Sequence, residues 1–349
     1  MLERAALATL LASFLVAHAG EIRIACAPAD KDCLLGALKA SPAKKMSLWK
    51  AAFAKPLEQR VGPAPREVIE LLTLDNLYNG YPERPRPSQV SDALRADVIA
   101  ALAGIPDAVK RRLADRLAGI VFVDGFGGTG FTDSIVGDDG RKSRAFVVLD
   151  PTVLEKRTAN SWATWKESTP FRADARHELR AVIERPEDDN RRQAIQYIML
   201  HELGHVLAVG ADFHPDWNLK VSEMPDGPYP FFDLSWSLDR AGNRYVNRFD
   251  AVLPERKDVV YYFGPKLPAS RMALTYSHLE LTNFPTLYAA THPGDDFAES
   301  FANYVHVVLM GKPFGIAIYE DGNVAKRYGP CWDEPRCAAK RAILEAFLR

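Results

Sequence analysis

The segment His201-Glu202-Leu203-Gly204-His205 constrains this 349-residue chain more than any other part of its sequence. Residues four apart lie on one face of an α-helix, so the imidazoles of His201 and His205 can bind the same metal ion. Glu202 would then lie beside the open coordination position, where a carboxylate can act as a general base. The segment therefore predicts a helix with a metal site on it.

The flanking sequence predicts that this helix is mostly buried. Residues 190–209 begin with polar and charged side chains and are followed by Gly210. Between these ends, apolar residues recur with helical spacing: Ile195, Ile198, Met199, Leu203, Val206 and Leu207. Glycine inside a helix costs about 1 kcal/mol relative to alanine, so Gly204 indicates that another element packs closely there. In this context the segment is the HExxH pattern of zinc hydrolases.

Residues 1–19 predict a secretory signal peptide. Arg4 precedes an apolar run from Ala6 to Ala17, and Ala17-His18-Ala19 matches an A-x-A cleavage site. The run is too short to span a bilayer, and no other segment approaches 18 uninterrupted apolar residues. We therefore expect cleavage near Ala19 and an exported mature chain, periplasmic or secreted, without a membrane span.

Composition agrees with an exported protein that does not bind nucleic acid. The chain has 44 basic and 45 acidic residues, so no basic surface is implied. Four cysteines form two local pairs, Cys26 with Cys33 and Cys331 with Cys337, and neither spacing is that of a zinc ribbon or a redox site. In an oxidising compartment they predict two disulfides. Two short local loops and two bonds joining the N-terminal to the C-terminal region fit the sequence equally well.

The apolar pattern predicts an α+β fold. Residues 20–87 indicate a mainly helical N-terminal region, and residues 88–349 the catalytic domain. Strand signals at 119–124 and 144–150 precede the HExxH helix, as the sheet does in zincin peptidases, where an edge strand can bind an extended peptide. The glycine-rich residues 125–130 between them lack the Gly-Lys-Ser/Thr of a phosphate-binding loop, so we interpret them as a hairpin or flexible connection.

A second His-Glu-Leu sequence does not predict a metal site. It is formed by His177, Glu178 and Leu179, but position 181, four residues after the histidine, is alanine. A single imidazole cannot supply the pair of ligands that the HExxH pattern provides. We interpret this segment as the surface of a helix.

A catalytic zinc site usually has three protein ligands, so the HExxH pair requires a third. His214 has the wrong spacing for a metzincin, and Glu223 lies in a segment whose proline and glycine disfavour a helix. Residues 295–305 instead predict a helix with acids in its first turn. Asp295 and Glu299 lie four residues apart on it and share a face.

An HExxH pattern followed by a helix of the form acid-x-F-A-E-x-F resembles the zinc peptidases related to anthrax lethal factor and to the clostridial Pro-Pro endopeptidases. Several uncharacterised bacterial families share it. The resemblance implies a zincin-like domain in which Asp295 is the third zinc ligand and Glu299 supports the site. It also implies that Tyr288, seven residues before Asp295, stabilises the transition state.

The resemblance covers only the catalytic helices, and the chain departs from it in two ways. Aspartate replaces the usual glutamate, and about 90 residues separate His205 from Asp295, more than in those relatives. The choice between Asp295 and Glu299 as the third ligand therefore stays open, and we favour Asp295. Tyr276 and Tyr304 are alternatives to Tyr288.

The segment between the two motifs, residues 211–293, is rich in proline, glycine, aspartate and aromatic residues. It is too long and too apolar to be a bare loop. We expect it to form an insertion over the cleft that shapes the substrate site.

Together these features predict an exported zinc metallopeptidase with one Zn²⁺ per chain and a peptide or protein substrate. Glu202 would be the general base and Tyr288 would bind the oxyanion, while His201, His205 and one of the two carboxylates would hold the metal. Two alternatives are a non-catalytic zinc-binding protein of the same fold and a purely structural exported protein.

Overall fold

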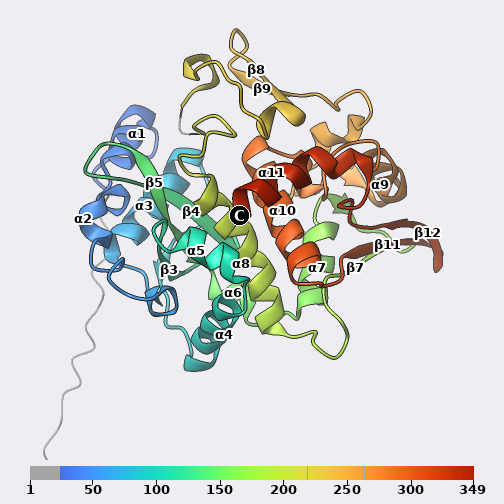
Figure 1. Cartoon of the computed structure of the whole chain (residues 1–349), viewed down its shortest axis with the longest axis horizontal. Helices are drawn as coiled ribbons and strands as arrows, with labels where there is room; N and C mark the ends of the chain where they lie inside the picture. Colours follow the sequence, from blue (N-terminus) through green and yellow to red (C-terminus); the bar gives the residue numbers. More distant parts are fainter. Residues whose placement is uncertain (1–23, 218, 263) are drawn as a thin grey trace, which may run out of the picture.

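The predicted HExxH helix lies at the centre of the molecule as α8, Arg191–Ala208. The computed structural model describes residues 24–217, 219–262 and 264–349, so the signal peptide predicted at 1–19 lies outside the described residues. The helix begins where the Asn190 side chain accepts a hydrogen bond from the backbone N–H of Gln193. In Figure 1, the N-terminal helices and the largest sheet lie on one side of α8, and the C-terminal helices lie on the other. The mixed architecture confirms the α+β class.

The largest sheet combines parallel and antiparallel strands. Along the sheet, the order is β1 (Val61–Pro63), β3 (Leu117–Asp124), β5 (Lys142–Leu149) and β4 (Gly130–Val136), and β2 (Arg86–Pro87) also pairs with β3. β1, β3 and β5 are parallel, whereas β4 runs antiparallel to β5 and ends the order. The predicted strands at 119–124 and 144–150 are thus β3 and β5. Sequence periodicity does not predict β4, because its central residues, Thr132, Asp133 and Ser134, are polar.

Both faces of this sheet are covered, which explains the near-continuous apolar runs of its central strands. Phe146 and Val148 of β5 pack in one core with α1 (Lys31–Ala40) and α3 (Arg66–Asn79). The alternate residues, Val147 and Leu149, pack in a second core with α8 and α4 (Asp92–Ala103). The sheet therefore fixes α8 from one side.

Helix α10 (Pro293–Tyr304) fixes α8 from the other side, and it contains the second predicted motif. The two helices meet at Gly204, where an added Cβ would lie 2.8 Å from Cα of Ala298. No larger residue fits at this crossing, which accounts for glycine in the middle of α8.

The remaining elements surround these two helices. A three-stranded antiparallel sheet has the order β12 (Asn323–Tyr328), β11 (Gly315–Glu320), β7 (His177–Val182). The other helices are α2 (Met46–Trp49), α5 (Asp107–Leu113), α6 (Pro151–Leu154), α7 (Ala159–Ser168), α9 (Met272–Leu279) and α11 (Ala338–Leu348). Short strand pairs are formed by β6 (Phe171–Arg172) with β10 (Leu267–Pro268), and by β8 (Trp236–Asp239) with β9 (Arg244–Asn247).

The prediction that His177, Glu178 and Leu179 lie on a helix surface is wrong. They begin β7, in which Leu179 and Ala181 are buried whereas Glu178, Arg180 and Val182 are exposed. The alternation has period two, that of a strand with one buried face.

The segment 211–293 packs against the rest of the molecule rather than forming a bare loop. The side chains of Phe231, Trp236, Tyr276 and Phe284 are almost completely buried and belong to the same core as α8 and α10. In Figure 1, the β8–β9 hairpin of this segment lies at the top, beyond α11.

All four cysteines form disulfides within local pairs. Cys26 is bonded to Cys33, and Cys331 to Cys337, so the structure selects the short loops from the two connectivities that the sequence allowed. The bonds are compatible with an oxidising compartment. Within residues 24–349, leaving aside positions 218 and 263, no helix has both the length and the apolar character needed to cross a membrane.

A buried ion pair fixes α11 to α10. Lys340 Nζ contacts Asp296 Oδ1, and both side chains are fully buried. Trp236 Nε1 donates to the other oxygen of Asp296 at 3.0 Å, and Ser300 Oγ lies 3.3 Å from Oδ1. Burial raises the pKa of Asp296, although Lys340 acts in the opposite direction, and burial lowers the pKa of Lys340. Each charge is tolerated there because the other is present.

Removing one partner of this pair should therefore destabilise the protein strongly. We expect Lys340→Met to lower the free energy of unfolding by about 3–5 kcal/mol, because Asp296 would keep a buried, unpaired charge. The double variant Lys340→Met/Asp296→Asn should recover much of that loss. Urea unfolding measures both. Arg66→Met, which breaks an exposed pair with Glu70, is the control and should cost no more than about 1 kcal/mol. Equal losses of unfolding free energy in Lys340→Met and Arg66→Met would contradict this account.

Candidate metal centre

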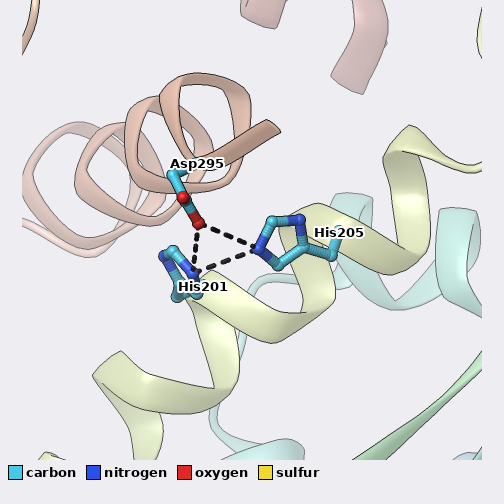
Figure 2. A group of neighbouring side chains, drawn as sticks. All are labelled: His201, His205 and Asp295. Carbon is cyan, nitrogen blue, oxygen red and sulfur yellow. Dashed lines mark hydrogen bonds and ion pairs between the residues drawn. The ribbon is translucent and has the colours of Figure 1, made fainter. Parts of the chain in front are cut away.

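Three predicted side chains converge in a group that could hold a metal ion: His201, His205 and Asp295. Nε2 of His201 lies 3.2 Å from Nε2 of His205. Oδ1 of Asp295 lies 3.8 Å from the first of these nitrogens and 3.6 Å from the second. Figure 2 shows the two rings rising from α8 toward the carboxylate, which descends from the first turn of α10.

The geometry of the group fits a single small cation. Two ligand atoms that are each about 2.0–2.1 Å from a tetrahedral zinc ion lie about 3.3 Å apart. The three separations are close to this value, so small side-chain movements would complete the coordination. Two imidazoles and one carboxylate are also a donor set that leaves a fourth position open for water.

Glu299, the other candidate ligand, lies on the opposite side of the His201 ring. Its Oε1 is 3.0 Å from Nδ1 of His201, whereas Asp295 approaches Nε2. A carboxylate at the second ring nitrogen fixes the tautomer and the orientation of a metal-binding imidazole. The two acids on the shared face of α10 therefore contact the two different nitrogens of one histidine.

A buried lysine, for which the sequence gave no expectation, neutralises Glu299. Lys166 Nζ of α7 lies 2.8 Å from Oε1 of Glu299, and Thr286 Oγ1 donates to Oε2 at 2.7 Å. Burial alone would raise the pKa of Glu299, but Lys166 and His201 beside it lower the pKa below its usual value. The carboxylate is thus held ionised next to His201. A sequence signal existed, because Lys166 continues the buried face of α7 that Trp162 and Ala163 begin.

The ligand group is also coupled electrostatically. Burial would raise the pKa of Asp295, but the neighbouring imidazoles, His205 above all, lower it below its usual value. Burial would lower the pKa of His205, but Asp295 and Glu202 raise it above its usual value. The negative charges around His205 therefore favour a cation at this position, either a proton or a metal ion.

Glu202 is positioned by the edge strand of the sheet. Thr132 Oγ1 of β4 donates to Oε2 of Glu202 at 2.7 Å. Gly130, at the start of β4, leaves room for the carboxylate, since an added Cβ would lie 2.8 Å from its Cδ. Glu202 is only 6% exposed, yet it borders both cavities at the metal group. Thr132 was not recognised as a functional residue because β4 was not predicted.

Tyr288 lies beside the His201–His205–Asp295 group, whereas Tyr276 and Tyr304 do not. The ring of Tyr288 is centred 5.5 Å from that of His201 and borders the same cavities as Glu202. Burial, and to a lesser degree Asp295, raise the pKa of Tyr288 well above its usual value, so its hydroxyl stays protonated. Tyr276 donates to Glu167 in the core, and Tyr304 packs against Trp332.

His214 and Glu223, which the sequence disfavours as metal ligands, lie outside the His201–His205–Asp295 group. His214 is buried, and its Nδ1 lies 2.8 Å from the carbonyl oxygen of Pro215. Glu223 is exposed in a short 3-10 turn, Val221–Glu223.

Two cavities meet at the metal group and share His201, Glu202 and Tyr288 in their walls. One, of about 220 Å³, extends past Lys166 toward Leu72 of α3 and Phe126 of the glycine-rich segment. The other, of about 360 Å³, extends past His205 and Asp295 toward Trp217. Residues of β4 border both cavities. An extended molecule could thus lie along β4 with its middle at the metal group.

No protein-family model, no curated protein and no solved structure matches the chain. What the chain does must be inferred from its own residues.

Metal binding should separate the roles of the two acids on α10. We expect the wild type to bind one divalent ion per chain and Asp295→Ala to lose it. Glu299→Gln should retain the ion with affinity about 10- to 100-fold weaker, because it removes a partner of His201 rather than a ligand. Equilibrium dialysis with elemental analysis measures both. Glu223→Gln is the matched control and should bind like the wild type. The reverse order, with Asp295→Ala retaining the metal and Glu299→Gln losing it, would contradict the assignment.

Metal affinity should also fall as the pH decreases. A histidine must be neutral to ligate, so a proton on His205 competes with the metal. Because Asp295 and Glu202 raise the pKa of His205, we expect this competition to begin above the usual titration range of histidine. Competition titrations between about pH 5 and pH 8 measure it. An affinity that does not change across this interval would contradict the prediction.

Proposed function

We propose that this protein is a zinc-dependent metallopeptidase that hydrolyses peptide bonds in the cleft beside β4. The observation that carries the proposal is the combination of the His201–His205–Asp295 group with a carboxylate, Glu202, held at the junction of two cavities. Two imidazoles from an HExxH helix together with one carboxylate are a ligand set of catalytic zinc sites.

Zinc bound by these three residues would lower the pKa of a water to about 7 and polarise a substrate carbonyl. Glu202 would take the proton from the attacking water and deliver it to the leaving amine. Thr132 donates to only one carboxylate oxygen, which leaves Oε1 able to accept that proton. Glu299, held in place by Lys166, would face Nδ1 of His201 and so orient Nε2 of that ring toward the metal.

Tyr288 would bind the oxygen that becomes negatively charged. Tyr288 borders the same cavities as Glu202, and its hydroxyl stays protonated, so donor and base would act on one carbonyl group. A preorganised donor of this kind contributes roughly 3 kcal/mol to the lowering of a barrier.

Three further features support the zincin-like assignment. The HExxH helix lies beneath a sheet whose edge strand, β4, borders the cleft; its outer edge is bridged to Lys45 at Val136, and the rest of that edge suits an extended peptide. The spacing of Asp295, Glu299 and Tyr288 matches the resemblance described above. The two disulfides agree with export, so we propose that the substrate is a peptide or protein outside the cytoplasm.

The variant Glu202→Gln tests this proposal. We expect kcat on a mixture of fluorogenic peptides to fall by about 10²- to 10⁴-fold, because general acid–base catalysis is lost, while one zinc ion per chain is retained. Glu178→Gln is the matched control, since Glu178 follows a histidine and precedes a leucine in the same way but is exposed on β7. It should leave the rate unchanged.

Two outcomes would count against the proposal. If Glu202→Gln cleaves peptides at the wild-type rate, Glu202 is not the base. If the zinc-loaded wild type cleaves no peptide of the mixture, a metal-binding protein without turnover becomes the better description.

A further inference from the structure

Tyr262 has a backbone conformation that its residue type disfavours. Its φ is +67°, in the left-handed region. Among the residues the structure describes, only two others apart from glycine have a positive φ, namely Asn243 and Asp321. Asparagine and aspartate adopt this conformation more readily than other residues, and both lie in the turns of β-hairpins. A bulky aromatic residue in the same region is an outlier that the surrounding structure must enforce.

The surrounding turn does not require an aromatic residue at this position. Two residues further on, the chain has Gly264, also with a positive φ of +98° and with no atom within 4 Å of an added Cβ. Glycine would relieve the strain at position 262 in the same way. The presence of tyrosine where glycine would be unstrained therefore suggests a role for its side chain.

The side chain of Tyr262 reaches the candidate active site. It borders the cavity of about 220 Å³ together with His201, Glu202 and Tyr288. Its ring is centred 6.3 Å from that of Tyr288 and 5.5 Å from that of Trp165. Tyr262 comes from the 211–293 segment, whereas Glu202 comes from α8, so the two residues form different walls of one cavity.

The hydroxyl of Tyr262 is available as a hydrogen-bond donor. Tyr261 and Tyr276 both donate to Oε2 of Glu167 at 2.8 Å, which uses their hydroxyls within the core. No described residue serves the hydroxyl of Tyr262 in that way. Burial raises its pKa well above the usual value, and the charges of Glu299, Glu167, Asp295 and Glu202 act in the same direction. The group is thus a neutral donor on a residue that lines the cavity.

We propose that the Tyr262 hydroxyl donates a hydrogen bond to the substrate carbonyl group next to Glu202, as a second catalytic donor beside Tyr288. This inference rests on the proposed peptidase function. It gives the strained backbone a role, because in this conformation the ring from the 211–293 segment lines the cavity. A packing role on Trp165 alone would need the ring but not the hydroxyl.

Tyr262→Phe separates the two roles. It keeps the ring and the backbone conformation and removes only the hydroxyl. With the fluorogenic peptide mixture, we expect kcat to fall on the order of 10²-fold with KM changed less than about threefold, and with thermal stability and zinc content unchanged. Tyr276→Phe is the matched control, because it removes a hydroxyl that is buried against Glu167. It should lower stability and leave kcat unchanged.

A second measurement does not depend on turnover. A peptidyl phosphonate, whose tetrahedral anion resembles the oxyanion, should bind the zinc-loaded Tyr262→Phe protein at least about tenfold more weakly than the wild type and Tyr276→Phe. If the wild type cleaves no peptide, the proposed function fails and this binding experiment still decides the role of Tyr262. Wild-type kcat in Tyr262→Phe, or unchanged phosphonate affinity, would overturn the inference.

Discussion

The close crossing of α8 and α10 at Gly204 is the contact on which the candidate site depends. An added Cβ there would lie within 2.8 Å of Ala298, so any side chain would force the helices apart. The separation of the helices sets the height of Asp295 above the two histidines. A shift of even 1 Å would take its carboxylate out of ligand distance, because metal–oxygen bonds of about 2.0–2.2 Å allow little variation. The smallest residue of the motif therefore has a role as specific as that of its histidines.

Helix α10 carries acids on two faces. Residues of α8 and α7 neutralise one face, and a residue of α11 neutralises the other. Asp295 and Glu299 face α8, where the histidines and Lys166 of α7 compensate them. Asp296 lies on another face and is paired with Lys340 of α11. Buried carboxylates are costly unless they are paired, so the helix is stable only when α7, α8 and α11 are all packed around it. The same arrangement lowers the pKa of Asp295 and of Glu299, and a cation site requires ionised carboxylates.

The walls of the cleft come from two different parts of the chain, the largest sheet and the 211–293 segment. The sheet contributes Thr132, which fixes Glu202, and the edge strand β4. The 211–293 segment contributes Tyr262 and Tyr288, which line the same cavity. In the proposed reaction, proton transfer would occur on the side of the sheet and charge stabilisation on the side of the insertion. The strained backbone at Tyr262 is then understandable as a cost of placing a donor accurately.

Much of the framework was predictable from sequence because it depends on short-range patterns. Helical spacing fixed α8 and the pairing of His201 with His205 on one face, and acids in a first turn predicted α10. Apolar runs predicted β3 and β5, and cysteine spacing identified the residues that form disulfides.

Only the tertiary structure determined the contacts between segments that are distant in the chain. Asp295 and Glu299 are equivalent on a helical wheel, and only the crossing with α8 assigns them to different nitrogens of His201. Lys166 meets Glu299 across 133 residues, and Thr132 meets Glu202 across 70. A sequence pattern states which side chains share a face, but packing alone determines what that face touches.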